Sequence, residues 1–391
     1  MRENYKKYSS WVKQVSIIIL KENYVKFDVM VLPGDGIGPE VVEQGVKLLN
    51  AISKKSGHTF NFEQDIIGGA AIDSYGVALK AETAEKSSKA DAILFGAVGG
   101  PKWDDPTAKV RPEDGLLAIR KALGVYANIR PVKSYSFLKD SIPLKSELVD
   151  DIDLIMIREL TGGLYFGKPK KQWTNSRGRV AVDTLKYTEK EITRILRVGF
   201  ELARGRNKKL TSVDKANVLE SSRLWRQIAI ELSAEYPDVK LEHQLVDSCT
   251  MQLIQNPRQF DVMVMENTFG DILSDEGSVL AGSLGMLPSA SLSGIPSADG
   301  SIKAKGLYEP IHGTAPDIAG QGKANPIATI LSVALLLRYS LGLPEEAKEI
   351  EAAVDTVLAQ GYRTADIGKE EEQIVTTEEL ANKIIELATN Y

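Results

Sequence analysis

The chain has 391 residues, of which 43% are hydrophobic and 26% charged, a composition that suits two soluble globular domains because single hydrophobic cores stop growing at roughly 250–300 residues. Its net charge of −5 argues against nucleic acid or an anionic membrane as a partner, and its apolar runs stay below the ~20 residues that a membrane span needs. A single cysteine, Cys249, permits neither an internal disulfide nor a zinc-thiolate site, so we expect a cytoplasmic protein.

The first 26 residues are interpreted as an extension without an assigned purpose. They carry six Lys/Arg and two Glu, and their apolar run is shorter than the ~7–15 residues of a secretory signal core. An organelle presequence stays an alternative for this segment.

Short apolar strands are predicted to alternate with helices. The strand at residues 27–32 runs into a glycine-rich turn, after which apolar residues recur at helical spacing. Polar, turn-rich stretches at residues 166–179 and 291–305 are expected to be exposed. The alternation predicts an α/β fold, with further strands at residues 92–98, 154–158, 210–214 and 262–265 and helices at residues 189–204 and 222–235.

The turn at residues 34–40, Gly-Asp-Gly-Ile-Gly-Pro-Glu, resembles a dinucleotide-binding fingerprint but lacks two of its requirements. Pro39 stands where the third glycine is needed, and no acidic residue ends a second strand about 20 residues later. We interpret the segment as a tight strand-to-helix turn with Pro39 at the first helical position. A dinucleotide site is therefore expected elsewhere.

Several basic residues with apolar neighbours are candidates for binding an anionic substrate. Arg120, Arg130 and Arg158 stand out because arginine forks bind carboxylates at two points, which suits a dicarboxylate, although a lone arginine is more often a surface ion pair. Lys215 follows a strand and is a candidate general base if its pKa is lowered.

Asp271 and Asp275 share one face if their segment is helical. Two carboxylates without a basic partner repel each other, and Mg²⁺ or Mn²⁺ offsets that repulsion. The alternative is a solvated acidic helix face. The apolar neighbours Phe269, Ile272 and Leu273 favour a cleft over that alternative.

The segment around His312 is the candidate cofactor site. Gly313 and Ala315 let the backbone approach a flat ligand, and Asp317 is suited to accept hydrogen bonds from a ribose diol. Because an acidic residue repels a 2′-phosphate, the segment predicts NAD over NADP.

The ordered motifs between Val29 and Leu343 resemble the 3-isopropylmalate dehydrogenases, which are β-decarboxylating dehydrogenases without a Rossmann fingerprint. The resemblance implies a two-domain isopropylmalate/isocitrate dehydrogenase-like fold. Its first domain is discontinuous, with residues 1–125 and 282–391, and residues 126–281 form the second domain with the dimer interface. The motifs are LPGDGIGPE, AVGGPKWD, RPEDGLLAIR, NIRPVK, RELTGGLYFG, SVDKANVL, FGDILSDE, GMLPSASL and EPIHGTAPDIAGQGKANP.

The resemblance also implies roles for single residues. The catalytic residues are Tyr165 and Lys215, and the partner subunit of a homodimer receives Lys215 and Asp247 in its active site. The expected cofactors are NAD and Mg²⁺ or Mn²⁺. The remaining implied sites are Arg120, Arg130, Arg158, Glu113, Leu116 and Leu117 for the substrate, Asp247, Asp271 and Asp275 for the metal, and His312, Gly313, Ala315, Asp317 and Asn325 for the cofactor.

The resemblance implies oxidative decarboxylation of 3-isopropylmalate in leucine biosynthesis. Leu116 and Leu117 offer an apolar pocket for a branched alkyl group and no partner for a third carboxylate, whose burial without a counter-charge is costly. Apolar discrimination is weak, at about 1–3 kcal/mol per methylene, so D-malate, homoisocitrate and isocitrate stay alternatives. A non-catalytic regulatory subunit is disfavoured because all the implied catalytic and metal residues are present.

Overall fold

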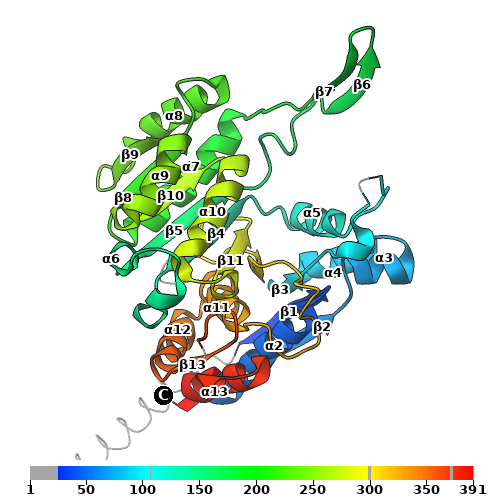
Figure 1. Cartoon of the computed structure of the whole chain (residues 1–391), viewed down its shortest axis with the longest axis vertical. Coiled ribbons are helices and arrows are strands. Elements are labelled where there is room, and N and C mark those ends of the chain that lie inside the picture. Colours follow the sequence, from blue (N-terminus) through cyan, green and yellow to red (C-terminus); the bar gives the residue numbers. More distant parts are fainter. Residues whose placement is uncertain (1–24, 106, 298–300, 370–372, 391) are drawn as a thin grey trace, which may run out of the picture.

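The computed structural model describes residues 25–105, 107–297, 301–369 and 373–390, so all but the last two residues of the predicted extension lie outside the described residues. Helices cover both faces of one large sheet, which confirms the predicted α/β class (Figure 1). The sheet contains β1 (Lys26–Gly34), β2 (Thr59–Gln64), β3 (Ala92–Ala97), β4 (Ala127–Lys133), β5 (Asp153–Glu159), β8 (Lys209–Asp214), β9 (Lys240–Leu245), β10 (Val262–Met265), β11 (Pro288–Leu292) and β12 (Gly306–Pro310).

The ten strands lie in the order β2-β1-β3-β12-β11-β4-β5-β10-β8-β9. Pairing is parallel within the group β2-β1-β3-β12 and within the group β5-β10-β8-β9. Around the centre, β11 is antiparallel to both β12 and β4, and β4 is antiparallel to β5. The sheet therefore continues through both predicted domains, whose boundaries stay a prediction.

The helices are α2 (Gly38–Ser56), α3 (Gly69–Tyr75), α4 (Ala81–Lys89), α5 (Pro112–Leu123), α6 (Ser146–Val149), α7 (Glu189–Arg204), α8 (Glu220–Ser233), α9 (Val246–Gln255), α10 (Asn267–Ala281), α11 (Ile327–Leu336), α12 (Pro344–Ala359) and α13 (Thr377–Asn390), with a π-helical segment η5 (Leu337–Leu341) after α11. Successive side chains of a strand point to opposite faces of the sheet, so each strand contributes to a hydrophobic core on either face. Val29 and Val31 of β1 belong to the large core with α2, whereas Met30 and Leu32 pack with Ile119 of α5. Within the described residues, no helix is long and apolar enough to cross a membrane.

The expected elements agree closely with the observed ones. The predicted helix at residues 189–204 is α7, and the strand at residues 262–265 is β10. The glycine-rich turn is also confirmed, with α2 beginning one residue before Pro39. One expectation was partly wrong, because residues 291–305 begin inside β11, where Ser291 and Leu292 are fully buried.

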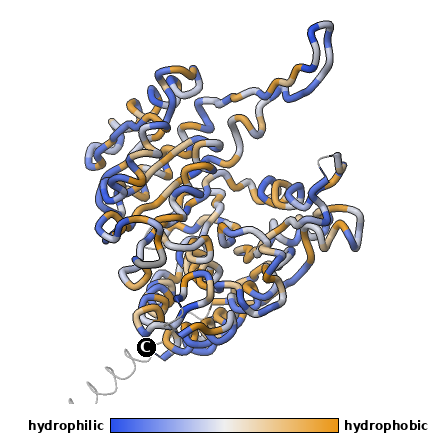
Figure 2. The backbone as a smooth tube through the Cα atoms, viewed as in Figure 1, coloured by the Kyte–Doolittle hydropathy of each residue, from blue (hydrophilic) through white to orange (hydrophobic). Residues whose placement is uncertain are grey.

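The stretch at residues 166–179 is exposed as predicted, but it also contains a regular element. β6 (Lys171–Asn175) and β7 (Gly178–Val182) form an antiparallel hairpin that projects from the body of the molecule (Figure 1). Figure 2 shows hydrophobic residues along the sheet and a hydrophilic tip on this hairpin. A two-stranded hairpin is only marginally stable by itself in water.

Candidate active site

One face of β4 and β5 carries two of the three predicted substrate arginines, Arg130 and Arg158. In the antiparallel register Arg130 lies opposite Met156, and Asn128 lies opposite Arg158. Helix α10 packs against this face, and Gly270 permits the approach, because a Cβ at that position would lie 2.6 Å from Cβ of Arg158. The sheet register therefore brings Arg130 and Arg158 beneath the helix that carries Asp271 and Asp275.

Arg158, Asp271 and Tyr165 form one contact group. The Arg158 guanidinium forms an ion pair with Asp271, and the Tyr165 hydroxyl donates to the other oxygen of Asp271 over 2.9 Å. Arg158 also donates to the Asn267 side chain over 3.0 Å and lies 5.9 Å from the Tyr165 ring centre. Burial, with the Asp271 carboxylate adding to it, raises the pKa of Tyr165 above its ordinary value.

Arg130 is held in a mostly buried position by neutral oxygens. It donates to Asn128 and to Ser274, both over 2.6 Å, and its guanidinium lies 3.7 Å from Asp275. Burial, followed by the charges of Arg158 and Arg120, lowers the pKa of Arg130 to about 10. Arg130 is therefore close enough to the other two predicted arginines for their charges to act on it.

Arg120 approaches from α5 and pairs with Glu309 of β12 over 2.6 Å. Its Nε is buried and has no hydrogen-bond partner within the residues that the structure describes. A buried guanidinium N–H without a partner is costly, and an incoming carboxylate would satisfy it.

The expectation about the acidic pair needs two corrections. Asp271 and Asp275 do lie on a helix, but both have basic neighbours in Arg158 and Arg130. Ile272 does not close a cleft over them, because 59% of it is exposed. Partial desolvation of Asp275, with the charge of Asp271 adding to it, raises the pKa of Asp275.

A second group consists of Lys215, directly after β8, and Asp247 of α9. Lys215 Nζ lies 2.7 Å from Asp247, and this hydrogen bond lowers the pKa of Asp247. Among the described residues, no three His, Cys, Asp or Glu side chains gather closely enough to hold a metal ion. Within one chain, Asp247 thus pairs with Lys215 and does not complete a three-carboxylate set.

The predicted alkyl-recognition residues lie on α5. Leu116 is partly buried against the smaller core, whereas Leu117 is 45% exposed and Glu113 is exposed. Leu117 is therefore available for contact with a ligand, and Leu116 mainly supports the helix.

The loop after β12 carries the predicted cofactor residues and rests on the glycine-rich turn. Ile37 donates its backbone N–H to the Thr314 carbonyl over 2.8 Å, and a Cβ on Gly36 would lie 2.1 Å from that oxygen. Glu40 accepts backbone N–H groups from Gly320 and Ala324. The glycines of this turn therefore serve backbone packing.

Within that loop, the predicted cofactor residues differ in solvent exposure and in whether their side chains already have hydrogen-bond partners. Asp317 and Gly313 are exposed, and Ala315 has a φ of 36°. Burial lowers the pKa of His312, whose Nε2 has no partner among the described residues. Asn325 is buried and already donates to Asp366 over 3.1 Å, so its amide holds the loop.

A buried acidic network behind the site was not predicted from the sequence. The Tyr187 hydroxyl lies 3.4 Å from Glu159 and 3.2 Å from Glu266, and it accepts the backbone N–H of Asn267. Glu266 also caps α10 by accepting from the Phe269 N–H, and burial raises the pKa of Glu266. Its position directly before the first residue of a helix was the available signal.

The sequence is similar to a protein-family model and to proteins of known name. A family model described as isocitrate/isopropylmalate dehydrogenase matches residues 28–384. Proteins named 3-isopropylmalate dehydrogenase from Dehalococcoides mccartyi and Bacillus subtilis are 61% identical over 362 residues and 57% identical over 349 residues. These alignments cover 92% and 89% of this chain and 99% and 93% of the relatives.

Solved structures give the same result. An isocitrate dehydrogenase from Methylococcus capsulatus matches with a TM-score of 0.80 at 33% identity, covering 93% of this chain and all of that one. A beta-decarboxylating dehydrogenase from Thermococcus kodakarensis matches with a TM-score of 0.73 at 34% identity, covering 93% and 96%. The resemblance seen in the motifs is confirmed, and the chain belongs to the isocitrate/isopropylmalate dehydrogenase family.

Proposed function

We propose that the protein is an NAD-dependent 3-isopropylmalate dehydrogenase that oxidises and decarboxylates 3-isopropylmalate to 2-oxoisocaproate in leucine biosynthesis. The observation that carries the proposal is the convergence of Arg130 and Arg158 with Asp271 and Tyr165 on one face of the sheet. The relatives at 57–61% identity carry the name of this activity.

The substrate follows from charge and apolar surface together. Two carboxylates suit a site to which three arginines contribute, because guanidinium forks bind carboxylates at two points. The exposed Leu117 on α5 offers apolar contact to a branched alkyl group.

The donor set fits a hard divalent cation. Asp271 and Asp275 supply two carboxylates one turn apart, and Mg²⁺ or Mn²⁺ completes its shell with substrate oxygens and water. When bound, such an ion stabilises negative charge on the substrate's hydroxyl and carbonyl oxygens. The raised pKa of Asp275 is consistent with a site that gains from a cation.

Two residues of the chain are assigned the proton transfers. Lys215, oriented by Asp247, removes the hydroxyl proton as hydride leaves C2, and loss of CO₂ from the resulting 2-oxo acid leaves an enolate. Tyr165 then delivers the proton that completes the product. Its raised pKa suits a group that must be protonated when it acts as an acid.

The cofactor is assigned to the loop after β12. A nicotinamide cofactor, when bound, accepts the hydride. The exposed carboxylate of Asp317 favours a free ribose diol over a 2′-phosphate, and the buried, unpartnered Nε2 of His312 offers a hydrogen bond to a ligand. Both features support NAD.

The active unit is proposed to be a homodimer. The projecting hairpin β6–β7 lacks further strands, which suits pairing with a second copy. Met251 is 56% exposed and lies one turn after Asp247 on α9, so an apolar contact and a catalytic carboxylate share one face. The proposed location is the cytoplasm, in keeping with the single buried thiol of Cys249.

The direct test is NADH formation at 340 nm by purified protein with Mg²⁺ and NAD. 3-Isopropylmalate, isocitrate, homoisocitrate and D-malate are compared side by side, with NADP as the cofactor control. Preference for 3-isopropylmalate and NAD is expected. If the enzyme prefers another of the four acids, that acid is the substrate. If it is inactive with all four, the proposed reaction is wrong.

A further inference from the structure

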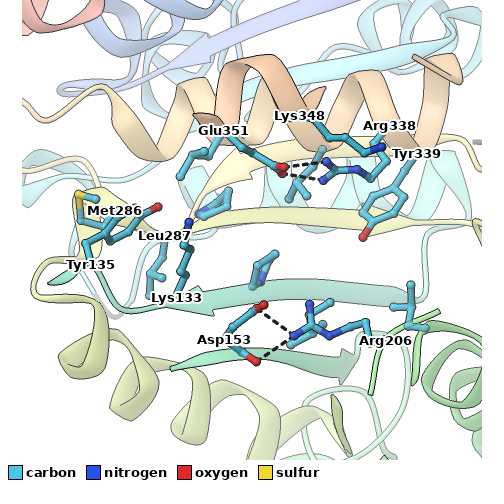
Figure 3. A pocket seen from close by; sticks show the side chains of 16 residues that line it. Lys133, Tyr135, Asp153, Arg206, Met286, Leu287, Arg338, Tyr339, Lys348 and Glu351 are labelled. Carbon is cyan, nitrogen blue, oxygen red and sulfur yellow. Dashed lines mark hydrogen bonds and ion pairs between the residues drawn. The ribbon is translucent and has the colours of Figure 1, made fainter. Parts of the chain in front are cut away.

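A cavity of about 410 Å³ lies on the opposite face of the strands that carry the substrate arginines (Figure 3). Pro131 and Ile155 line it and pair with each other across β4 and β5. Their neighbours Arg130 and Met156, which also pair, point to the other face, because side chains alternate along a strand. The cavity is therefore directly behind the proposed active site and separate from it.

The cavity lies between the sheet on one side and helices on the other, and it is partly open to solvent. Its sheet side comes from β4, β5 and Pro288 of β11, and its helix side comes from α11, η5 and α12, with the end of α7 closing one flank. Leu202, Leu331 and Leu335 give it an apolar interior. Its volume falls within the roughly 300–1,000 Å³ typical of small-molecule sites.

Two tyrosines make this interior more than an apolar gap. Tyr135 and Tyr339 are 6% and 4% exposed, and both line the cavity. No hydrogen bond is formed by either hydroxyl within the described residues, yet neither is a fully buried polar atom, so both are accessible from the cavity. Figure 3 shows Tyr339 pointing from the helix side toward the strands. Both hydroxyls can therefore donate to a ligand or to water inside the cavity.

The charged lining favours an anion at the rim. Arg338 and Arg206 are committed to carboxylates, at 2.6 Å from Glu351 and 2.8 Å from Asp261. Lys133 and Lys348 are less committed, because their ion pairs with acids outside the cavity lining are exposed to solvent and contribute little. Both ammonium groups can therefore turn to a ligand's anionic group.

We propose that this cavity binds a small amphipathic anion, with an apolar body among the leucines and tyrosines and one carboxylate or sulfonate between Lys133 and Lys348. Because β4 and β5 carry the cavity on one face and Arg130 and Arg158 on the other, a bound ligand is also coupled to the dicarboxylate site. The coupling rests on the proposed function, whereas the binding does not.

The binding test uses 8-anilinonaphthalene-1-sulfonate as the probe, followed by its fluorescence with the purified full chain. One saturable site per chain is expected. Tyr339→Phe should weaken binding by about two- to tenfold, the effect of one neutral hydrogen bond, without lowering the Tm of the free protein. Leu335→Trp, which fills the cavity, should abolish the site.

Two charge reversals serve as a matched pair. Lys348 and Lys383 both lie on exposed helix faces with a glutamate at i,i+3 spacing, but only Lys348 lines the cavity. Lys348→Glu should weaken probe binding, and Lys383→Glu should not. If Leu335→Trp folds and binds the probe as tightly as the parent protein, the proposed site is wrong. If Leu335→Trp does not fold, equal probe binding by Lys348→Glu and Lys383→Glu shows that the site is wrong.

The coupling is measured as the change in probe Kd on saturation with 3-isopropylmalate and Mg²⁺. A shift of more than about twofold supports communication across β4 and β5, and the dicarboxylate Kd must then shift by the same factor in the presence of the probe. An unchanged probe Kd overturns the coupling but not the site. If 3-isopropylmalate itself does not bind, the proposed function fails while the probe result stands.

Discussion

At the scale of single residues, the two proposed proton-transfer groups can be separated by kinetics. Lys215→Met removes the proposed base, so the rate of oxidation should fall by about 10²–10⁴-fold. The matched control is Lys240→Met, because Lys240 is an exposed lysine that pairs with Glu242 of its own strand, β9, and should be dispensable. The measurement is NADH formation, with circular dichroism to verify folding. Near-normal turnover in Lys215→Met would remove this residue as the base.

Tyr165→Phe should affect a later step than Lys215→Met. The lost hydroxyl donates to Asp271 over 2.9 Å and is assigned the final protonation, so hydride transfer should continue while product formation slows. Stopped-flow absorbance at 340 nm should show a burst of NADH in Tyr165→Phe followed by a slow steady state. Equal loss of the burst and of the steady-state rate would place Tyr165 in oxidation itself.

At the scale of elements, the start of α10 should make stability depend on pH. Burial raises the pKa of Glu266 above its ordinary value of 4.5, so the folded state binds more protons than the unfolded state above pH 4.5. Stability contributed by the protonated form is therefore lost as the pH rises through the folded pKa. Burial is the main cause, whereas the hydrogen bonds from the Phe269 N–H and the Tyr187 hydroxyl act in the opposite direction and lower the pKa of Glu266.

Glu266→Gln should raise the free energy of unfolding at pH 8 by about 1 kcal/mol and change it little near pH 4.5, because a glutamine can donate to Tyr187 and still cap Phe269. Glu266→Ala is the control, since it loses the cap and should destabilise by about 0.5–2 kcal/mol at both pH values. Urea unfolding at the two pH values measures this. A destabilisation of Glu266→Gln at pH 8 equal to that of Glu266→Ala would contradict the argument.

Single helices and strands could be predicted from the sequence, but contacts between distant elements could not. Strands such as β10 were predictable because a short apolar run between two turns is typical of a buried strand. Helix α7 was predictable because its apolar residues recur at helical spacing and Thr188 caps it. The partners of Asp271 and Asp275 were not predictable, since Arg158 and Arg130 lie more than a hundred residues away in sequence and reach them through the register of β4 and β5. The Glu159–Tyr187–Glu266 network was missed for the same reason.

At the scale of the whole molecule, the two groups of proposed catalytic residues lie on different elements. Arg158, Tyr165 and Asp271 contact one another, whereas Lys215 pairs with Asp247 on α9. The sequence could supply both groups through its motifs, but how one chain relates to a second depends on surfaces that a sequence does not display. In the dimer proposed above, Met251, which is 56% exposed and one turn from Asp247 on α9, would lie in the interface between the subunits.

A mixing experiment decides whether the active site is shared between subunits. Lys215→Met and Asp271→Asn homodimers should each be nearly inactive, since every site lacks one essential group. When the two variants are unfolded together and refolded as an equal mixture, half the dimers are mixed, and one of the two sites in each combines intact Asp271 with intact Lys215 from the other chain. Activity should therefore recover to about a quarter of that of the parent enzyme refolded in the same way. If Lys215 serves its own chain, every site in the mixture still lacks a group, and the mixture stays as inactive as the separate variants.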